Sequence, residues 1–596
     1  MIRPRVLLFL APFALVPALA AGCGTTGERN SGFTPAPEPG PTTFEPPSCN
    51  EPPTCSTDLL STVDCNGKAT ACSPGLGCLK GACVPACEAA LAQQSTIGCE
   101  YFATVPSDVV ISQGSCYAVM IANVWNAPVD VALSWGDRKI STSYIRRPRG
   151  SGGSIAYELL PDGKLPPNEI AIAFLSSRKP VSGRPKDWTG TPCPDEVGAA
   201  IVEEAWVPNG GRGKAFHLET SAPVIAYDIY PYGGAATFFP SASLLLPVSA
   251  WGKNYVAIDG YGASPDMLNG GFFPYMQIVA AEDDTTVSLL PSVTLRGGPN
   301  LPDAPPGVVY KTKLARGEVV QFSQRDEVNG TFVESDRPIG LLGGNSCADI
   351  PFGKDACDSL HQAVPPISQM GDAYVATRYR DRRSTNDTNL EIVPWRIVGV
   401  VDGTELRYDP EVPNAPKTIG RGQTIEFNAP GPFVIRTQDK AHPVYVGSYM
   451  TAGDLAPYRL NASGATSGHG DPEWVNVPPL DQFISNYVFL TDPTFGNTNL
   501  VFVRSTANGG GKDVTLDCLG TVTGWQKVGS SDYEMARVDL VFRGQPVGEC
   551  ANGAHRAFSD APFGLTVWGF DDYASYGYVA GMAAKPLNEV RVPVVN

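Results

Sequence analysis

The sequence has few charged residues, few histidines and no long stretch with the spacing of an amphipathic helix. Only 17% of its 596 residues are charged, and its five histidines are scattered along the chain. It contains no HExxH, Gly-x-Ser-x-Gly, phosphate-loop or dinucleotide-binding motif. We therefore predict no catalytic residue, no cofactor and no metal site, and so a protein that is not an enzyme. An exported hydrolase of envelope or matrix glycans is the alternative, because paired catalytic carboxylates need no local motif.

The overall charge excludes some classes of partner. A formal net charge of −16 and an isoelectric point near 4.9 argue against binding to nucleic acid and against electrostatic docking on anionic lipid. The 63 glycines and 55 prolines are too many for a helical protein. Composition thus favours an acidic protein rich in turns.

The N-terminus predicts export. Residues 1–22 place Arg3 and Arg5 before the apolar run VLLFLAPFALVPALA, which is too short to span a membrane as a helix. The run ends in Ala-Ala-Gly-Cys, similar to the recognition sequence of bacterial lipoproteins, so we expect Cys23 to carry a lipid. Ordinary signal-peptide cleavage is the alternative. Gly24 after the cysteine suggests sorting to the outer membrane and a place at the cell surface.

A spacer and a cysteine-rich module follow. Residues 23–48 are rich in proline and cannot bury a core, so we predict an extended tether after the lipid. Residues 49–97 contain seven closely spaced cysteines. Without Cys23, fourteen cysteines remain, an even number that favours disulfides in an oxidising compartment. Zinc binding is the weaker interpretation, since the module has no CxxC pair and no histidine.

The remaining cysteines are further apart. Their spacing suggests that Cys347 pairs with Cys357 and Cys518 with Cys550, while Cys116 pairs with either Cys193 or Cys99. A catalytic thiol is the alternative for these residues. We disfavour it because no histidine and asparagine partner is suggested nearby.

From residue 98 onward the pattern is that of β-strands. Short runs such as YAVMIANVW and PVDVALSW favour Val, Ile, Tyr and Phe and are separated by Gly, Pro, Asp and Asn. Only CEAALAQQ in the cysteine-rich module looks helical. We therefore predict an all-β fold.

Segments of the chain also repeat. The strand, acidic turn and strand of IVAAEDDTTVSLLP (278–291) match IVGVVDGTELRYDP (397–410), and both turns suit a hairpin. Residues 337–375 join one such unit to the next, ending an apolar strand and restarting after a Pro-Pro step. Two segments echo it, LLLPVSAWGKNYVAI (244–258) and VNVPPLDQFISNYVFL (475–490).

Each repeat is about 100 residues long. This length and its roughly seven strands favour a two-sheet sandwich, because a propeller blade takes only about 40–45 residues. We predict tandem β-sandwich-like modules; the alternative is a β-propeller built from the same repeats. Their predicted bounds are residues 98–245, 246–364, 365–476 and 477–596.

The repeats carry a resemblance to a known family. GCEYFA, CYAVMIANVW, the 337–375 segment and SYGYVAG resemble the bacterial branch of the IgGFc-binding protein N-terminal domain family, from about Cys99 to the end. The cysteine-rich segment before GCEYFA is similar to the arrangement in myxobacterial-type predatory soil bacteria. The resemblance implies a surface protein with a binding or adhesion role, and an extracellular protein or polysaccharide as ligand.

One aromatic cluster is a candidate ligand platform. Tyr227, Tyr230 and Tyr232 lie close together in the sequence, and exposed aromatic rings give a large contact area at little entropic cost. Packing in the core is the interpretation that we favour over a platform.

Overall fold

The computed structural model describes residues 52–594, except positions 57, 94, 108–113, 151–153, 179–189, 208, 238, 265–271, 355–356, 383–389, 461–465 and 508–510. The predicted signal peptide, Cys23 and the proline-rich spacer lie outside the described residues. All described residues belong to one unit, Glu51–Asn596. Among them, no helix has both the length and the apolar character needed to cross a membrane.

The all-β prediction is confirmed. Strands form almost all of the regular structure, and α1 (Ala86–Gln93) is the one α-helix in the part of the chain that the structure describes. This helix covers most of the CEAALAQQ segment that looked helical. Its Ala86, Ala89 and Ala90 are buried, so the small side chains let the helix approach its neighbours closely.

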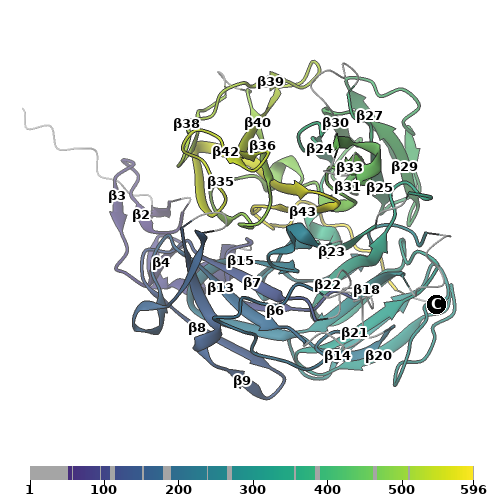
Figure 1. Ribbon diagram of the computed structural model, residues 1–596, viewed down its shortest axis with the longest axis horizontal. Coiled ribbons are helices and arrows are strands. Elements are labelled where there is room, and N and C mark those ends of the chain that lie inside the picture. The colour runs from purple at the N-terminus through teal and green to yellow at the C-terminus, as the bar shows by residue number, and fades with distance from the viewer. Residues whose placement is uncertain are drawn as a thin grey trace, which may run out of the picture. The chain divides into compact units, whose positions relative to one another are not determined.

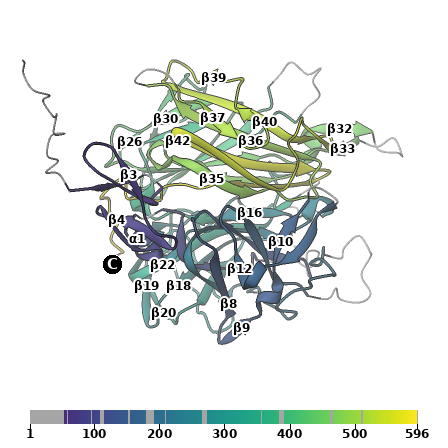
Figure 2. The same ribbon diagram turned by 90° about the vertical axis from the view of Figure 1, so that its left-hand side faces the viewer.

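The cysteine-rich module is a set of short strands held by disulfides. Its strands are β1 (Thr54–Cys55), β2 (Ser61–Val63), β3 (Ala69–Ala71), β4 (Leu76–Leu79) and β5 (Ala82–Pro85). Cys55–Cys78 and Cys72–Cys83 lie within the module, and Cys87–Cys99 ties α1 to β6 (Gly98–Ala103). Helix α1 packs on β4, next to which it is labelled in Figure 2. It also packs on β6 and β15 (Phe216–Tyr230). The module is therefore docked on the first β-sheet.

The rest of the chain forms four groups of strands, which follow one another from blue through teal and green to yellow in Figure 1. The first group is β6, β7 (Tyr117–Asn123), β8 (Val129–Trp135), β9 (Arg138–Ile140), β10 (Ile145–Arg149), β11 (Ala156–Leu159), β12 (Lys164–Leu165), β13 (Ile170–Ser176), β15 and β16 (Ser241–Leu244). The second is β14 (Gly211–Lys214), β17 (Gly252–Val256), β18 (Pro274–Ala280), β19 (Thr285–Leu290), β20 (Tyr310–Leu314), β21 (Glu318–Ser323), β22 (Phe332–Ala348) and β23 (Asp358–Val364). Strand β14 lies within the predicted 98–245 module, yet it pairs with β21 of the second group.

The third and fourth groups complete the set. The third is β24 (Ala373–Ala376), β25 (Val393–Gly399), β26 (Thr404–Glu405), β27 (Arg407–Asp409), β28 (Thr418–Ile419), β29 (Thr424–Ala429), β30 (Phe433–Arg436), β31 (Val444–Met450), β32 (Pro457–Leu460), β33 (Thr466–Gly468) and β34 (Glu473–Asn476). The fourth is β35 (Ile484–Leu490), β36 (Asn497–Ser505), β37 (Val514–Leu516), β38 (Gly520–Thr521), β39 (Gln526–Lys527), β40 (Tyr533–Phe542), β41 (Gln545–Pro546), β42 (Ala554–Asp571) and β43 (Ala574–Val579).

In three of the four groups one long strand belongs to two layers. The first half of β22 pairs with β17 and β19, whereas its second half pairs with β18 and β23. The two halves of β15 and of β42 likewise pair with different strands. In the third group two separate strands replace the long one: β30 pairs in one layer and β31 in the other. Each change of layer falls at a proline, namely Pro223, Pro338, Pro443 and Pro562. Proline has no N–H to donate to a β-ladder, so it favours the point where the strand leaves one layer.

This layering makes each group sandwich-like, but the predicted hairpin is wrong. Strands β18 and β19 flank the acidic turn at Asp283 and Asp284, yet they pair with different parts of β22 and not with each other. Asp284 has a φ of 55°, as a tight turn requires. The turn therefore carries the chain from one layer of the sandwich to the other.

Four strands, one from each group, pack around a common centre. Strand β16 contacts β23, β23 contacts β34, β34 contacts β43, and β43 contacts β16. Each of them is hydrogen-bonded to the long strand of its own group. We call β16, β23, β34 and β43 the central ring.

The groups are joined by three equivalent segments, residues 247–255, 366–374 and 479–487, which we call the proline–tyrosine segments. Each begins with a proline, passes through a short 3-10 helix and ends in a tyrosine: η6 (Val248–Ala250), η8 (Ile367–Gln369) and η10 (Leu480–Gln482) precede Tyr255, Tyr374 and Tyr487. In a fourth copy, Tyr101 follows Gly98 in β6. The repeat seen in the sequence is thus a repeat of structure.

Hydrogen bonds between the two ends of this region also join the first group to the fourth. The hydroxyl of Thr96 donates a hydrogen bond to the carbonyl of Met582 at 2.9 Å and accepts one from the Met582 N–H at 3.0 Å. Thr96 is fully buried. Residues separated by 486 positions therefore join the first group to the fourth.

Candidate functional site

The proposed tyrosine platform is not on the surface. The exposed fractions of Tyr227, Tyr230 and Tyr232 are 1, 4 and 3%. The Tyr227 hydroxyl donates to the carbonyl of Val488, and that of Tyr232 lies 3.0 Å from the hydroxyl of Tyr157. Tyr227 and Tyr230 lie in β15 and Tyr232 lies just after it, and all three rings are buried, so they stabilise the fold and offer no contact surface. Core packing, the favoured interpretation, fits their positions.

The cysteines of the four groups occur as disulfides. Cys116 is bonded to Cys193, Cys347 to Cys357, and Cys518 to Cys550. Cys99 is bonded to Cys87, which leaves Cys193 as the partner of Cys116. A disulfide sulfur is not a thiolate, so none of these cysteines is a nucleophile in this state. Cys23, the predicted lipid carrier, lies outside the described residues.

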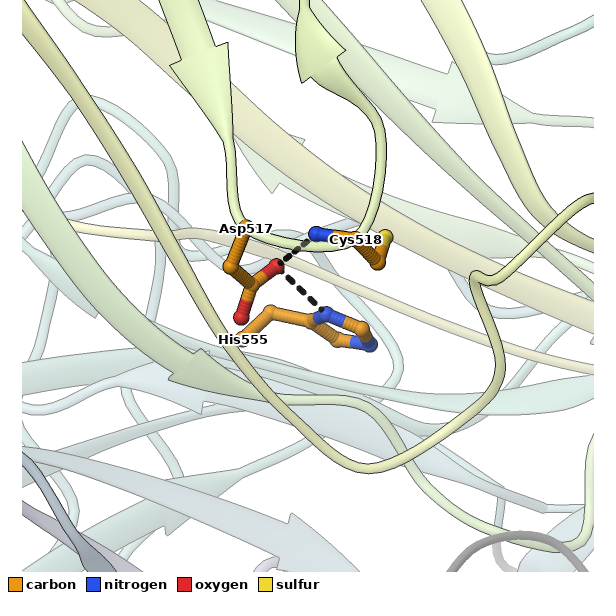
Figure 3. A group of neighbouring side chains, drawn as sticks. All are labelled: Asp517, Cys518 and His555. Atoms are coloured by element: carbon orange, nitrogen blue, oxygen red, sulfur yellow. Dashed lines mark hydrogen bonds and ion pairs between the residues drawn. The ribbon is translucent and has the colours of Figure 1, made fainter.

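Asp517, Cys518 and His555 are close enough to hold a metal ion (Figure 3). However, Cys518 is in a disulfide, and the other two groups bind protein atoms. His555 Nδ1 lies 3.1 Å from Asp517 Oδ1, and its Nε2 lies 2.6 Å from the Ala551 carbonyl. Burial opposes ionisation of Asp517, but the His555 hydrogen bond and backbone N–H groups outweigh it and lower the pKa of this carboxyl. The cluster therefore fixes the chain beside the Cys518–Cys550 disulfide.

A second acidic cluster joins the first two groups. Glu100 Oε1 lies 3.0 Å from His217 Nε2 and 2.6 Å from an amino nitrogen of Arg316. The hydrogen bond from His217 lowers the pKa of Glu100, against a smaller opposing effect of burial. Because Arg316 already supplies a positive charge to Glu100, this cluster is an ion-pair network between β6, β15 and the second group.

Asp228, Tyr275 and His361 have residue types found in catalytic sites. The hydroxyl of Tyr275 lies 2.9 Å from His361 Nδ1, and His361 Nε2 lies 3.4 Å from Asp228 Oδ2. All three side chains are buried. They lie between the first and second groups, where a substrate has no access, and so form a buried polar network.

Side chains cap the free edges of the central ring. The N–H groups of His361 and Ala363 in β23 donate to the hydroxyls of Ser241 and Ser243 in β16, at 3.1 and 2.9 Å. Each central strand has one edge that lacks a backbone partner, and an unpaired edge is costly when buried. Side chains of the neighbouring strand supply the missing acceptors.

Buried carboxyls do the same for β43. Asp358 accepts from the Ser575 N–H at 3.2 Å, and Glu473 accepts from the Gly577 N–H at 3.0 Å. Burial raises the pKa of both carboxyls well above their usual range, and the nearby carboxyls of Asp471 and Glu473 raise that of Asp358 further. Both acids serve the fold as hydrogen-bond acceptors along the free edge of β43.

A pocket lies at the centre of the ring, beside the proline–tyrosine segments. It spans about 510 Å³ of empty space, part of which is open to solvent. All four central strands contribute to it, through Leu244, Gln362, Asn476 and Val579. Most other lining residues are apolar, which is typical of a small-molecule site. We call it the axial pocket; it is the strongest candidate binding site in the described part of the chain.

Nothing in the sequence pointed to this pocket. Its lining residues come from four repeats, and each one looks like an ordinary core residue in its own strand. The sequence does show that one segment beginning with proline recurs. This recurrence marks equivalent positions in the repeats, but it does not show that these positions meet around one pocket.

Comparison with known proteins gives the family. A model of the family described as IgGFc binding protein matches residues 241–569, which is more than half of the chain. The chain belongs to the IgGFc-binding protein family. The matched range runs from β16 into β42 and covers the third strand group of this family member and all of the second group except β14.

A curated relative is the human IgGFc-binding protein. It is 23% identical to this family member over 354 residues, which cover 58% of the chain studied here. The same residues cover only 6% of the human protein, so the chain corresponds to a small part of that relative.

Proposed function

We propose that the chain is a non-enzymatic binding protein that recognises an extracellular protein or polysaccharide. The observation that carries this proposal is the match of residues 241–569 to the IgGFc-binding family, together with a human relative named for binding the Fc part of an antibody. The name of the human protein does not identify the ligand of this chain.

We further propose that the protein is a lipoprotein of the bacterial outer membrane, exposed at the cell surface. The support is the sequence of residues 1–48, with its export signal, lipid-acceptor Cys23 and proline-rich spacer. A spacer of this composition gives reach, which serves a binding protein more than a diffusing enzyme.

The roles of the buried acids favour binding over hydrolysis. Asp358 and Glu473 accept hydrogen bonds from β43, and Glu100 and Asp517 are held by His217 and His555. Carboxyls that serve the fold in this way are not free for general acid and base chemistry.

A capture experiment tests the proposed function. The bait is the chain with Cys23→Ser, which prevents lipid attachment and retains the Cys87–Cys99 disulfide. Immobilised bait is incubated with envelope and matrix fractions, and a reduced and alkylated sample of the same chain is the matched control. Saturable capture of a protein or polysaccharide by the oxidised bait alone supports the proposal. Cleared zones on polysaccharide zymograms, without stable capture, would show a hydrolase instead.

Anchoring is tested separately. The unmodified chain should fractionate with the outer membrane and be labelled by a surface-restricted reagent, whereas the Cys23→Ser chain should be released. Globomycin, which blocks the lipoprotein signal peptidase, should cause a precursor to accumulate. Equal release of both chains would contradict lipid attachment.

A further inference from the structure

The axial pocket combines apolar walls with one unused hydrogen-bond acceptor. Leu244, Met370, Val446, Val579 and Met582 line it, and they come from the four strand groups and the segments beside them. Apolar walls that surround an isolated polar atom favour a ligand with an apolar body and one polar group. Gln369 supplies the polar atom.

The orientation of the Gln369 amide is fixed by its neighbour. Its Nε2 donates to the carbonyl of Ala250 at 2.6 Å. An amide oxygen cannot make this bond to another oxygen, so the nitrogen must face Ala250. Gln369 is 4% exposed, and its Oε1 has no hydrogen-bond partner among the described residues. A buried acceptor without a partner costs free energy unless a bound molecule satisfies it.

An equivalent glutamine, Gln482, has both ends of its side-chain amide hydrogen-bonded within the protein. Gln482 occupies the same place in the next proline–tyrosine segment, and its Nε2 donates to the Gln369 carbonyl at 3.1 Å. Its Oε1 accepts from the Lys585 N–H at 3.1 Å. Gln482 thus has both ends of its amide paired by the protein, whereas Gln369 lines the pocket with its acceptor unused. The two residues differ in surroundings and not in type.

The pocket also has a way in. Pro365, Asn476, Val477 and Pro478 line it and are only partly buried. Asn476 is held in place, because its Nδ2 donates to the Ala363 carbonyl at 2.8 Å and its Oδ1 accepts from the Tyr445 hydroxyl at 2.6 Å. The mouth is therefore a fixed rim of short and rigid side chains, which suits a small rigid molecule.

We propose that the axial pocket binds a small, mostly apolar molecule that donates one hydrogen bond to Gln369 Oε1. A planar ring carrying one N–H or O–H, such as an indole or a phenol, has this chemistry. The site is separate from recognition of a macromolecular ligand, so either proposal can fail without the other.

The first test uses indole as the probe and methionine methyl groups as reporters. The chain contains eight methionines, and Met370 and Met582 line the pocket. Titrating indole into the full chain labelled with ¹³C-methyl methionine should shift these two signals in a saturable way. The other methionine signals should stay in place. The signals are assigned with the volume-conserving variants Met370→Leu and Met582→Leu. Saturable shifts elsewhere only, or none at all, would overturn the proposal.

The second test isolates the hydrogen bond. Indene has the shape of indole but no N–H, and it should bind about ten-fold more weakly, as expected for loss of one buried hydrogen bond. Gln369→Met should weaken indole binding by a similar factor and leave indene binding unchanged. Gln423→Met is the matched control, because Gln423 is an exposed glutamine that does not line the pocket, and this variant should bind indole as the parent does.

Two outcomes decide the assignment if a variant does not fold. The comparison of indole with indene needs only the parent chain, so it remains decisive. Equal affinity for both probes would show that the ligand donates no hydrogen bond to Gln369 Oε1, and it would overturn the proposal. A ten-fold preference for indole with shifts at Met370 and Met582 would support it.

Discussion

The hydroxyl of Tyr255 lies 2.6 Å from the carbonyl oxygen of Ile339, the residue that follows Pro338 where β22 changes layer. The same hydroxyl accepts a hydrogen bond from the Gly252 N–H at 2.8 Å. Tyr101, Tyr374 and Tyr487 make the corresponding bonds to Val224, Val444 and Phe563, each of which also follows a proline. One tyrosine per group thus fixes the bend of the long strand.

Replacing this tyrosine by phenylalanine should destabilise the fold. Tyr255→Phe leaves the Ile339 carbonyl and the Gly252 N–H without their partner inside the core, and the expected loss is about 1–3 kcal/mol of the free energy of unfolding. Chemical denaturation followed by tryptophan fluorescence measures it. Tyr310→Phe is the control, because the Tyr310 hydroxyl has no hydrogen-bond partner among the described residues. Equal stabilities of the two variants would show that the bond does not hold the bend.

The glycine of the second proline–tyrosine segment should not tolerate a methyl group. A Cβ at Gly371 would lie 2.5 Å from the Cβ of Pro479, and the same contact recurs between Gly252 and Pro366. Gly371→Ala must push two strand groups apart, so we expect a loss of about 1–3 kcal/mol. In Gly420→Ala the new methyl meets only the ends of the Asp402 and Gln423 side chains, which can move. A melting temperature of Gly371→Ala equal to that of Gly420→Ala would contradict the tight contact.

Asp471 should make the protein less stable as pH rises. Burial raises its pKa to about 8, although the Gly453 N–H and Arg382 partly oppose this. The unfolded chain ionises near pH 4. Between these values the folded state binds more protons than the unfolded state, so the free energy of unfolding falls from about pH 4 to pH 8.

The variant Asp471→Asn tests this sign. An amide imitates the neutral acid, so the variant should be more stable than the parent at pH 8, by about 2 kcal/mol or more, and its stability should depend less on pH in this range. Asp517→Asn is the opposite case. Its carboxyl has a lowered pKa, so its contribution is present above about pH 4 and disappears as the pH falls. If the free energy of unfolding of the parent instead rises from pH 5 to pH 8, Asp471 is ionised in the fold and the prediction is wrong.

The Cys116–Cys193 disulfide should contribute strongly to stability. It closes a loop with a sequence separation of 77, for which the chain-entropy model gives roughly 4–5 kcal/mol. The double variant Cys116→Ser and Cys193→Ser should therefore unfold at a much lower denaturant concentration. Removing Cys72 and Cys83, with a separation of 11, should cost less and leave the unfolding of the four strand groups nearly unchanged. The reverse order of the two costs would contradict the model.

The sequence predicted the class of fold because the strands are short, apolar and regularly interrupted. It also predicted equivalent units, since Pro366 and Pro479 introduce nearly the same residues. It failed at the turn of Asp283 and Asp284, where turn chemistry suited a hairpin but both flanking strands are taken by β22. Local preference cannot show which partner wins when a third strand is available.

Burial decides between the two interpretations of the tyrosine cluster. The close spacing of Tyr227, Tyr230 and Tyr232 fits both an exposed aromatic face and a core, and all three side chains are buried. The axial pocket was out of reach for a different reason. Leu244, Gln369 and Met582 are far apart in the sequence, and only the packing of four groups brings them together.

The contact between Thr96 and Met582 has a consequence for how the molecule is made. An exported chain that emerges N-terminus first can fold its first three groups before the fourth has emerged, but the innermost strands of these groups stay open to solvent on one side. Only when β43 and Met582 emerge can the last gap be filled. Before β43 emerges, the three incomplete groups expose unpaired strand edges. A chaperone is most needed at this stage.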